Sequence, residues 1–569
     1  MDVQHIPLSE YVSWESELNL QDSQIRIRNS NDCSILVVNG AEYRIRTECM
    51  DREEVASQII AALATAKREP VEAALGRVEE NIFQQQMTKE DEAKLVKKMD
   101  LHILPIIILM YLCCFMDRIN IGNARLYGLE EELGMHGHDF PLAVSCLFVT
   151  YVLGITPASL LVKKVSDKLD GELNASLPSD PVLTLIVPLL AIGWGVVSSC
   201  IGFVRTKTEL FLLRLLLGLF EAGYFATVCL YFTFFYRRRE LGKRISYLFA
   251  TTAFAGSIAG LLGYGIGSLD MQRGLRAWRW LMIIEGTPSI VLGLISYFVL
   301  ADTPEEATYL TEREKSFLGV RRYLDGTNLG VSDSQGIIQW DQCFAAWSDW
   351  KVWTMAVAQV GVASMLYSYS SFLPTIIKGM GFGALTSQLL SIPCYFFGAL
   401  TYLLAAFLSD RLGHRGGFVV GACLCSIAGY ATLLGTGHQP ARIQFIGCLV
   451  VAGGLFVAVG MPISWSANNL PSHYKRAAGQ GTIQMVGNLA GVYSPFLYLP
   501  QYGPRFVVGH SFTMGSIFYA AILFGIVSYK LRRENHRRAR GERDYLLEGR
   551  SQEDINQLGD RHPWYRYID

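Results

Sequence analysis

The sequence predicts an all-α polytopic membrane protein with about twelve transmembrane helices in two six-helix halves. Of its 569 residues, 51% are hydrophobic and only 18% are charged, whereas an ordinary soluble domain carries about 25% charged residues. The charged residues gather at positions 1–100, in loops and at 532–569. Between them run apolar stretches near the ~20 residues that a helix needs to cross a bilayer. This distribution indicates a chain that crosses a membrane many times.

A polar stretch at 301–352 separates the sixth apolar segment from the seventh and so divides the chain into six segments plus six. We expect an extension at 1–87, a first half at 88–300, a linker at 301–352, a second half at 353–531 and a tail at 532–569. Hydropathy places the spans at 102–124, 139–162, 183–204, 209–236, 244–267, 280–300, 353–376, 385–408, 416–435, 442–463, 478–499 and 510–531.

The N-terminal extension has a different pattern from the rest of the chain. Alternating apolar residues at 35–45 surround Asn39-Gly40, which is a strong signal for a two-residue hairpin. Helical spacing follows at 51–67. A small ββα module is therefore expected, and its sequence points to no function.

Lysine and arginine are more frequent in the loops on one side of the predicted bundle. That side includes Arg237, Arg238 and Arg239, and the tail, and the excess favours a cytosolic location for both termini. The net charge of −1 gives no reason to expect a nucleic-acid partner. Most of the 12 cysteines lie in apolar stretches without a CxxC pair, which favours small buried side chains over disulfides or metal ligands. We expect no metal, no cofactor and no enzyme chemistry.

Four ionisable residues lie inside two otherwise apolar segments. Asp117 and Arg118 are adjacent in the first span, and Arg214 and Glu221 are seven apart in the fourth, so the second pair shares one helix face. A charge near a bilayer centre costs about 2.5–3.5 kcal/mol on insertion scales, and such residues usually mark substrate or proton pathways. Two plainer interpretations stay open. The first span could end before Asp117, and Arg214 with Glu221 could form a structural ion pair.

The residue types suit two different tasks. Guanidinium groups keep their proton and bind carboxylates with two parallel hydrogen bonds, so they suit an anionic substrate. The proton affinity of a carboxyl group depends on burial and on neighbouring charges. Arrival of a proton or departure of an anion can therefore change the state of such a cluster, which is the physical basis of proton coupling.

A second motif, LSDRLGHR at 408–415, directly follows the eighth span. Its Asp410, Arg411, Gly413 and Arg415 combine a glycine turn with charges that can hold neighbouring helix ends together. An ordinary basic loop is the alternative. With this motif the chain resembles the major facilitator superfamily, whose loops after the second and eighth helices carry such a pattern. The first copy, at 161–165, keeps only basic residues and is followed by an insert at 166–182.

Within the superfamily, the chain resembles the anion:cation symporter family and, more narrowly, its fungal allantoate permease branch. The resemblance covers about residues 88–569. It rests on DRINIGNA (117–124), RLLLGLFEAG (214–223), WRWLMIIEG (278–286), DTPEEA (302–307), FLPTIIK (372–378), WSANN (465–469) and KR (475–476). One departure is Ala226, where the branch often has proline.

The resemblance implies roles for individual residues. Arg118 and Arg214 match arginines that contact a substrate carboxylate, and Asp117 and Glu221 match proton carriers. Tyr151 matches a substrate-facing tyrosine and Asn488 a polar contact. Packing and an interhelical hydrogen bond are the plainer alternatives for these last two. Polarity alone adds a set of further candidates in the second half, namely Tyr367, Tyr369 and Gln484.

We therefore expect a monomeric secondary transporter in the plasma membrane that couples uptake of a small organic carboxylate to a proton by alternating access. Its partners are then the carboxylate, the proton and the lipid bilayer. Allantoate, nicotinate and other vitamin-like anions fit the resemblance, and the sequence does not choose among them. A proton-driven drug exporter and a non-transporting nutrient sensor are the alternatives. Two arginines in the cavity argue against the exporter, because it favours cationic or apolar cargo.

Overall fold

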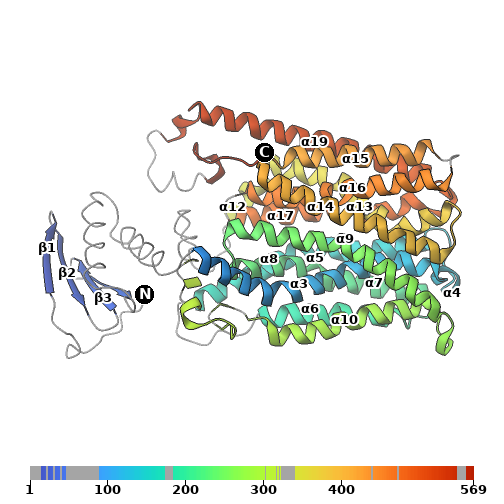
Figure 1. Cartoon of the computed structure of the whole chain (residues 1–569), viewed down its shortest axis with the longest axis horizontal. Coiled ribbons are helices and arrows are strands. Elements are labelled where there is room, and N and C mark those ends of the chain that lie inside the picture. The colour runs from blue at the N-terminus through green and yellow to red at the C-terminus, as the bar shows by residue number, and fades with distance from the viewer. Residues whose placement is uncertain are drawn as a thin grey trace. The chain divides into compact units, whose positions relative to one another are not determined.

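The computed structural model describes residues 89–172, 183–301, 303–318 without 305 and 316, 321, 340–436, 440–470, 473–547 and 559–569, together with four strands between Glu15 and Arg46. The described part of the chain is dominated by long helices that run side by side (Figure 1). We call the end of this bundle near Lys351 and Asp560 the base, and the end near Glu132 the top.

In its described residues, the first half contains eight helices and two 3-10 turns. These are α3 (Lys89–Leu126), α4 (Leu129–Glu132), α5 (Asp139–Glu172), α6 (Leu183–Ile201), α7 (Lys207–Ala222), α8 (Tyr224–Phe235), α9 (Arg238–Ile266), η2 (Gly267–Leu269), η3 (Gln272–Gly274) and α10 (Ala277–Val299).

The second half and the tail follow the linker. They contain α12 (Trp340–Trp347), α13 (Trp350–Gly379), α14 (Ala384–Leu412), α15 (Gly416–Gly435), α16 (Ala441–Asn468), α17 (His473–Asn488), α18 (Ala490–Tyr493), η4 (Ser494–Tyr498), η5 (Pro500–Tyr502), α19 (Val507–Ala539), η6 (Asp544–Leu546) and η7 (Gly559–Arg561).

All twelve expected spans fall on these helices. Within the described ranges, nine helices are long and apolar enough to cross a membrane, and shorter apolar helices lie at Asp139–Ile155 and Leu185–Ile201. The predicted all-α polytopic membrane fold is therefore confirmed. The remaining expected span, at 478–499, falls on the shorter elements α17, α18 and η4. Two spans are interrupted. The fourth divides into α7 and α8 at Gly223, whose carbonyl accepts a hydrogen bond from Thr227 Oγ1 at 2.8 Å. The eleventh divides after Asn488.

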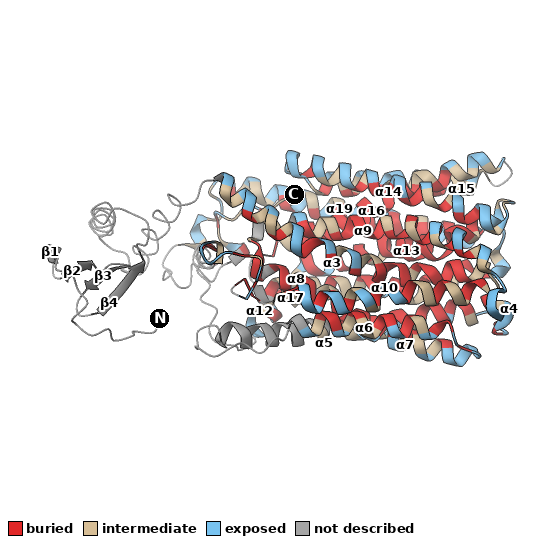
Figure 2. Cartoon of the chain, turned by 60° about the horizontal axis from the view of Figure 1, so that its bottom comes forward, coloured by how far each residue is buried: buried red, intermediate tan, exposed pale blue. Residues whose placement is uncertain are grey.

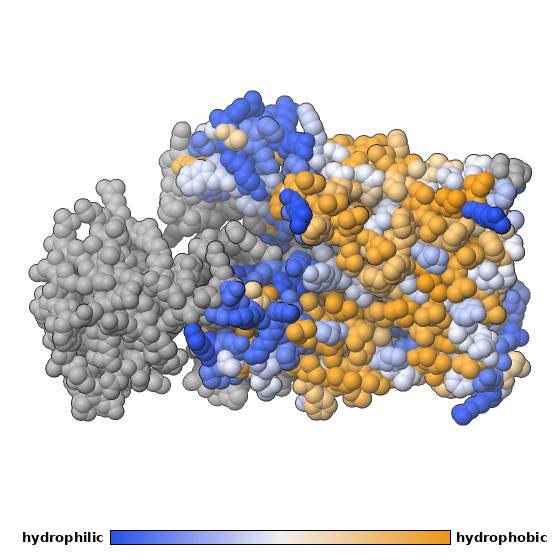
Figure 3. Space-filling model, viewed as in Figure 1, coloured by the Kyte–Doolittle hydropathy of each residue, from blue (hydrophilic) through white to orange (hydrophobic). Residues whose placement is uncertain are grey.

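The flank of the bundle has the character of a lipid-facing surface. Hydrophobic side chains cover most of the visible flank, and hydrophilic ones gather at its two ends (Figure 3). Exposed large hydrophobic residues occur in both halves, including Leu153, Leu212, Phe298, Leu404 and Phe518. A soluble monomer rarely exposes apolar area on this scale. Buried residues occupy the interior between the ends (Figure 2).

Small residues let the helices of the first half approach closely, as is common in membranes. A Cβ atom added to Gly218 of α7 would lie 2.1 Å from the carbonyl oxygen of Leu147 in α5. One added to Gly286 of α10 would lie 2.3 Å from Ser199 Oγ in α6. These two contacts fix α7 against α5 and α10 against α6, around the ionisable residues described below.

The two halves meet where α9 packs against α14 and α16, and where α5 packs against α17 and α18. Ser257 Oγ of α9 donates to the carbonyl of Ile392 in α14 at 3.3 Å. Ser145 Oγ of α5 donates to the carbonyl of Val492 in α18 at 2.7 Å. These serines bond to main-chain carbonyls across the boundary, so the contact depends little on the identity of the facing side chains.

The N-terminal extension contains a four-stranded antiparallel sheet in the order β1 (Glu15–Leu20), β2 (Ser23–Asn29), β3 (Cys33–Val38) and β4 (Ala41–Arg46). Val38 pairs with Ala41, which is the register that a two-residue connection at Asn39-Gly40 requires. β1 and β2 were not expected from the sequence. The helix expected at 51–67 lies outside the described residues.

Candidate substrate and proton site

The four ionisable residues singled out in the sequence lie together inside the first half. Asp117, Arg214 and Glu221 are buried, with exposed fractions of 2%, 1% and 1%. α3 continues beyond Arg118 to Leu126. Asp117 and Arg118 are therefore part of the first transmembrane helix and do not merely flank it.

Arg118 forms an ion pair with Glu221 that joins α3 to α7. Its Nε donates to Oε2 of Glu221 at 2.6 Å, and its side chain is 10% exposed. The guanidinium carbon lies 4.2 Å from the ring centroid of Tyr151 on α5, within range of a cation–π interaction. The partner of Glu221 is thus Arg118, and not the arginine on its own helix.

Asp117 and Arg214 form a second, less complete contact. Ser198 Oγ of α6 donates to Asp117 Oδ1 at 2.5 Å, and Arg214 Nη1 donates to the main-chain oxygen of Asp117 at 3.2 Å. Within the described part of the chain, Asp117 Oδ2 and Arg214 Nε and Nη2 have no hydrogen-bond partner. Buried polar groups are normally paired, so these atoms have capacity for a further ligand or proton.

The second half reaches this cluster through Tyr367 of α13. Tyr367 interacts with Arg118 and donates a hydrogen bond to Asn488 Oδ1 of α17. Its ring centroid lies 4.3 Å from that of Phe148 on α5. Asn488 Nδ2 donates to the main-chain oxygen of Gln484 at 2.6 Å, where the eleventh span breaks. Arg118 therefore lies where residues of both halves converge.

The other polar candidate of this helix lies in a different environment. The Tyr369 hydroxyl donates to the carbonyl of Cys448 in α16 at 2.9 Å, which is a contact inside the second half. Tyr369 thus joins two helices of one half, whereas Tyr367 faces the boundary between the halves. Gln484 takes part in the site through its main-chain carbonyl, which accepts the hydrogen bond from Asn488 Nδ2.

Sequence reasoning missed two residues of the cluster. Glu285 of α10 is 3% exposed and interacts electrostatically with Asp117 and Arg214. Ser198 supplies the hydrogen bond to Asp117 described above. Glu285 is an acid within an apolar span and part of the WRWLMIIEG motif, so its sequence carried a usable signal. A serine in a membrane helix gives no comparable signal, so Ser198 could not be predicted from the sequence.

The residues of the LSDRLGHR motif lie at the base. Gly413 ends α14 in the left-handed conformation, with φ of 69°, which glycine adopts without strain. Arg415 Nη2 donates to Asp410 Oδ1 at 2.9 Å. Arg411 is exposed, and its guanidinium lies over the ring of Phe407 at 4.4 Å. The turn and one ion pair of the expected arrangement are present.

The C-terminal segment 559–569 binds the base of the second half through a cluster of four charges. Asp560 forms ion pairs with Lys351 of α13 and Lys475 of α17, and the Lys475 pair measures 2.8 Å. Asp349 contacts the same two lysines at 3.3 and 2.9 Å. Burial alone would raise the pKa of Asp560, but the two ammonium groups lower it to about 2.

Hydrogen bonds extend this attachment to α16 and to the LSDRLGHR motif. Ile568 N donates to Asn469 Oδ1 at 3.0 Å, and Asn469 Nδ2 donates to the Ile568 carbonyl at 2.9 Å. Trp465 Nε1 donates to the same carbonyl at 2.7 Å. The main-chain nitrogen of Arg415 donates to the Asp569 oxygen at 2.6 Å. The segment thus connects the base ends of several helices.

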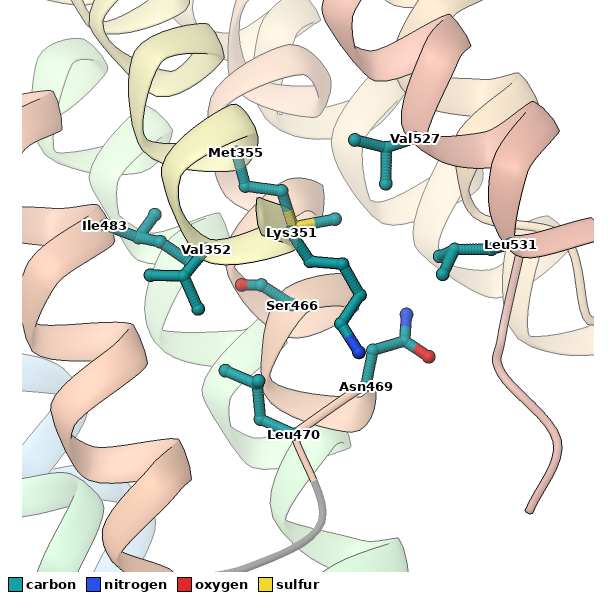
Figure 4. A pocket seen from close by; sticks show the side chains of 9 residues that line it. All are labelled: Lys351, Val352, Met355, Ser466, Asn469, Leu470, Ile483, Val527 and Leu531. Atoms are coloured by element: carbon teal, nitrogen blue, oxygen red, sulfur yellow. The ribbon is translucent and has the colours of Figure 1, made fainter. Parts of the chain in front are cut away.

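A small pocket lies at the base, between α13, α16, α17 and α19 (Figure 4). Most of its lining is apolar, including Val352, Met355 and Leu470. Its cation, Lys351, is already paired with Asp349 and Asp560. The pocket therefore offers no free charge to an anion, and it is separate from the cluster around Arg118.

Comparison with known proteins agrees with this arrangement. The sequence profile of the Major Facilitator Superfamily matches residues 107–495. The chain belongs to the Major Facilitator Superfamily. This transporter is 34% identical to an uncharacterized transporter of Schizosaccharomyces pombe, over 79% of its own length and 88% of the relative's. It is 27% identical to a high-affinity nicotinic acid transporter of Saccharomyces cerevisiae, over 79% of each chain.

The fold of the transporter also resembles a solved structure. A bacterial homolog of the human lysosomal transporter Spinster matches with a TM-score of 0.52 and 16% identity, over 75% of this chain and 96% of that one. At this identity the likeness concerns the fold alone. Together with the family match, it identifies a transport protein and not an enzyme.

Proposed function

We propose that this transporter couples uptake of a small organic carboxylate to movement of a proton. The observation that carries the proposal is the position of Arg118. It is the cation that reaches Tyr367 of the second half while it is paired with a buried carboxylate, Glu221, of the first. An anion arriving between the halves would therefore meet Arg118 first.

Exchange of partners on Arg118 provides the coupling. A substrate carboxylate that takes the guanidinium must displace Glu221, and a buried carboxylate without a partner costs several kcal/mol. Glu221 then binds a proton, because the neutral acid has the lower free energy in a buried site without a cation. Substrate and proton thus bind together and leave together. Tyr151 holds the plane of the guanidinium, and Asn488 holds Tyr367 in place.

The relatives support the substrate class. A relative at 27% identity is named a high-affinity nicotinic acid transporter, and nicotinic acid carries one carboxyl group on a flat ring. Aromatic side chains beside Arg118, namely Tyr151 and Tyr367, suit a flat anion of that kind. In this proposal the base faces the cytosol, both termini are cytosolic, and the transporter acts in the plasma membrane.

The test measures uptake of labelled nicotinate, and of a panel of other carboxylates, at two external pH values. We expect the Arg118→Ala variant to lose most of the wild-type uptake, since it has no guanidinium at this position to bind the substrate carboxylate. Arg442→Ala removes an exposed arginine and is the matched control. Uptake should increase at the lower external pH.

Three outcomes would contradict the proposal. Undiminished uptake by Arg118→Ala, at equal amounts in the membrane, would remove Arg118 from the site. Uptake that is indifferent to the pH gradient would remove the proton. Efflux of the label against the same gradient would indicate an exporter.

A further inference from the structure

Glu285 is a buried acid that the mechanism above does not use. It lies in the middle of α10 and is 3% exposed. Within the described residues, neither Oε1 nor Oε2 has a hydrogen-bond partner. An ionised carboxylate buried without a hydrogen bond is strongly disfavoured. The environment of Glu285 therefore favours the protonated acid.

The charges of the cluster lead to the same conclusion. Three carboxyl groups, those of Asp117, Glu221 and Glu285, face two guanidinium groups, those of Arg118 and Arg214. With all five ionised, the cluster would hold one uncompensated negative charge in the interior of the bundle. One bound proton makes it neutral. Because Glu221 is paired with Arg118 at 2.6 Å, the proton belongs to Asp117 or to Glu285.

The hydrogen bonds show which of the two acids holds the proton in this conformation. Asp117 Oδ1 accepts a bond from Ser198 at 2.5 Å, and such a bond stabilises a carboxylate. Glu285 has no such donor. Both acids interact electrostatically with Arg214, whose Nε and Nη2 are buried and have no partner among the described residues. Arg214 can thus be neutralised by either acid.

Among the described residues, few other titratable groups act on Glu285. From α3 these are Asp117 and the Cys113 thiol, and from α7 Arg214. α6, which packs closely against α10, contributes the Ser199 hydroxyl near Gly286. Asp117 and Glu285 therefore have one counter-ion in common, Arg214.

We propose that Glu285 is a proton-binding residue of this transporter that shares a single proton with Asp117. In this conformation Glu285 holds the proton and Asp117 neutralises Arg214. When Asp117 takes the proton, Glu285 becomes the counter-ion of Arg214. The transfer breaks the O–H bond of the Glu285 carboxyl group and forms one on Asp117. The inference rests on the proposed function for its role in coupling, but the shared proton can be tested without any transport.

Infrared difference spectroscopy on the purified protein tests the shared proton directly, since a protonated carboxyl group has a carbonyl stretch that a carboxylate lacks. We expect wild-type protein at neutral pH to show this band and Glu285→Gln to lose it. The Asp117→Asn variant should lose it too, because Glu285 must then ionise to neutralise Arg214. Glu542→Gln, at an exposed position, is the control and should keep the band.

Persistence of the band in Glu285→Gln would overturn the proposal. Persistence in Asp117→Asn would show that Glu285 holds its proton independently, which would overturn the sharing. Both results stand even if no carboxylate substrate is found, so they separate this inference from the proposed function.

Transport provides the second measurement. In proteoliposomes, Glu285→Gln should still exchange labelled for unlabelled nicotinate, but its accumulation driven by a pH gradient should fall below that of the wild type, because the proton on Glu221 remains while the proton shared with Asp117 is lost. Glu285→Asp keeps a titratable group and should keep accumulation with a displaced pH profile. If Glu285→Gln fails to fold, this second variant decides the question. A wild-type pH profile in Glu285→Asp, or wild-type accumulation in Glu285→Gln, would contradict the proposal.

Discussion

The two halves of the transporter handle buried charge in opposite ways. In the first half, Asp117, Arg214 and Glu285 lie in the interior with hydrogen-bonding atoms that have no partner in the described chain. In the second half, Lys351, Lys475 and their acidic partners lie at the base in a closed set of ion pairs. The difference indicates which charges are available for exchange and which fix the structure.

Removal of Arg214 should have the largest effect. Arg214→Ala leaves Asp117 and Glu285 in the interior without a cation, and removing one partner of a buried charged group costs about 3–5 kcal/mol. We expect uptake to be lost while protein remains in the membrane, with both measured on the same vesicles. Arg214→Lys keeps the charge and should recover part of the uptake. Normal uptake by Arg214→Ala would show that the first-half charges are structural.

Removal of Asp560 should change stability rather than transport. Asp560→Asn takes one carboxylate from the two lysines at the base. From a pKa lowered to about 2, we expect the free energy of unfolding to fall by roughly 2–3 kcal/mol near neutral pH. Uptake per folded molecule should stay close to wild type. Thermal unfolding of purified protein and uptake together test both statements.

The pH dependence of this variant sharpens the comparison. A carboxyl group whose pKa is lowered by folding stabilises the protein above its unfolded pKa and loses that contribution as the pH falls through the folded value. The stability difference between wild type and Asp560→Asn should therefore shrink between about pH 4 and pH 2. A difference that is constant over this range would mean that the ion pairs with Lys351 and Lys475 contribute little.

Removal of Arg411 should have the smallest effect. Arg411 belongs to the LSDRLGHR motif but is exposed and lies over Phe407. We expect Arg411→Ala to change stability by less than about 1 kcal/mol, the usual range for an exposed cation–π contact. Arg415→Ala, which breaks the pair with Asp410 and borders the C-terminal segment, should cost more. Equal losses in a thermal unfolding series would contradict this ranking within the motif.

Hydropathy predicted the membrane fold well because lipid imposes a simple length and composition on each span. The ionisable cluster was also accessible, since Asp117, Arg118, Arg214 and Glu221 stand out against apolar surroundings. The sequence did not show which of these four residues pair with one another. Arg214 and Glu221 share a helix face, yet Glu221 binds Arg118 of another helix, and only the packing of α3 against α7 decides that.

Other parts of the structure left weaker signals or none. Glu285 is a single acid in its span and has no neighbouring cation on the same helix face, so its signal is weaker than that of the paired charges in the first and fourth spans. The attachment of residues 559–569 could not be found, since Asp560 and Ile568 belong to no motif and their partners lie about 85–210 residues away. Such contacts depend on tertiary structure, which local sequence patterns do not encode.

The ion pair between Arg118 and Glu221 has a consequence for biosynthesis. The two residues are separated by 103 positions, and Asp117 and Ser198 by 81. The first transmembrane helix is therefore made well before its partners exist. A single helix that carries two charges inserts into lipid with a high free-energy cost. We therefore expect the first helix to remain bound to the insertion machinery until the third and fourth spans emerge. The same residues that would bind substrate thus set the order in which the helices enter the bilayer.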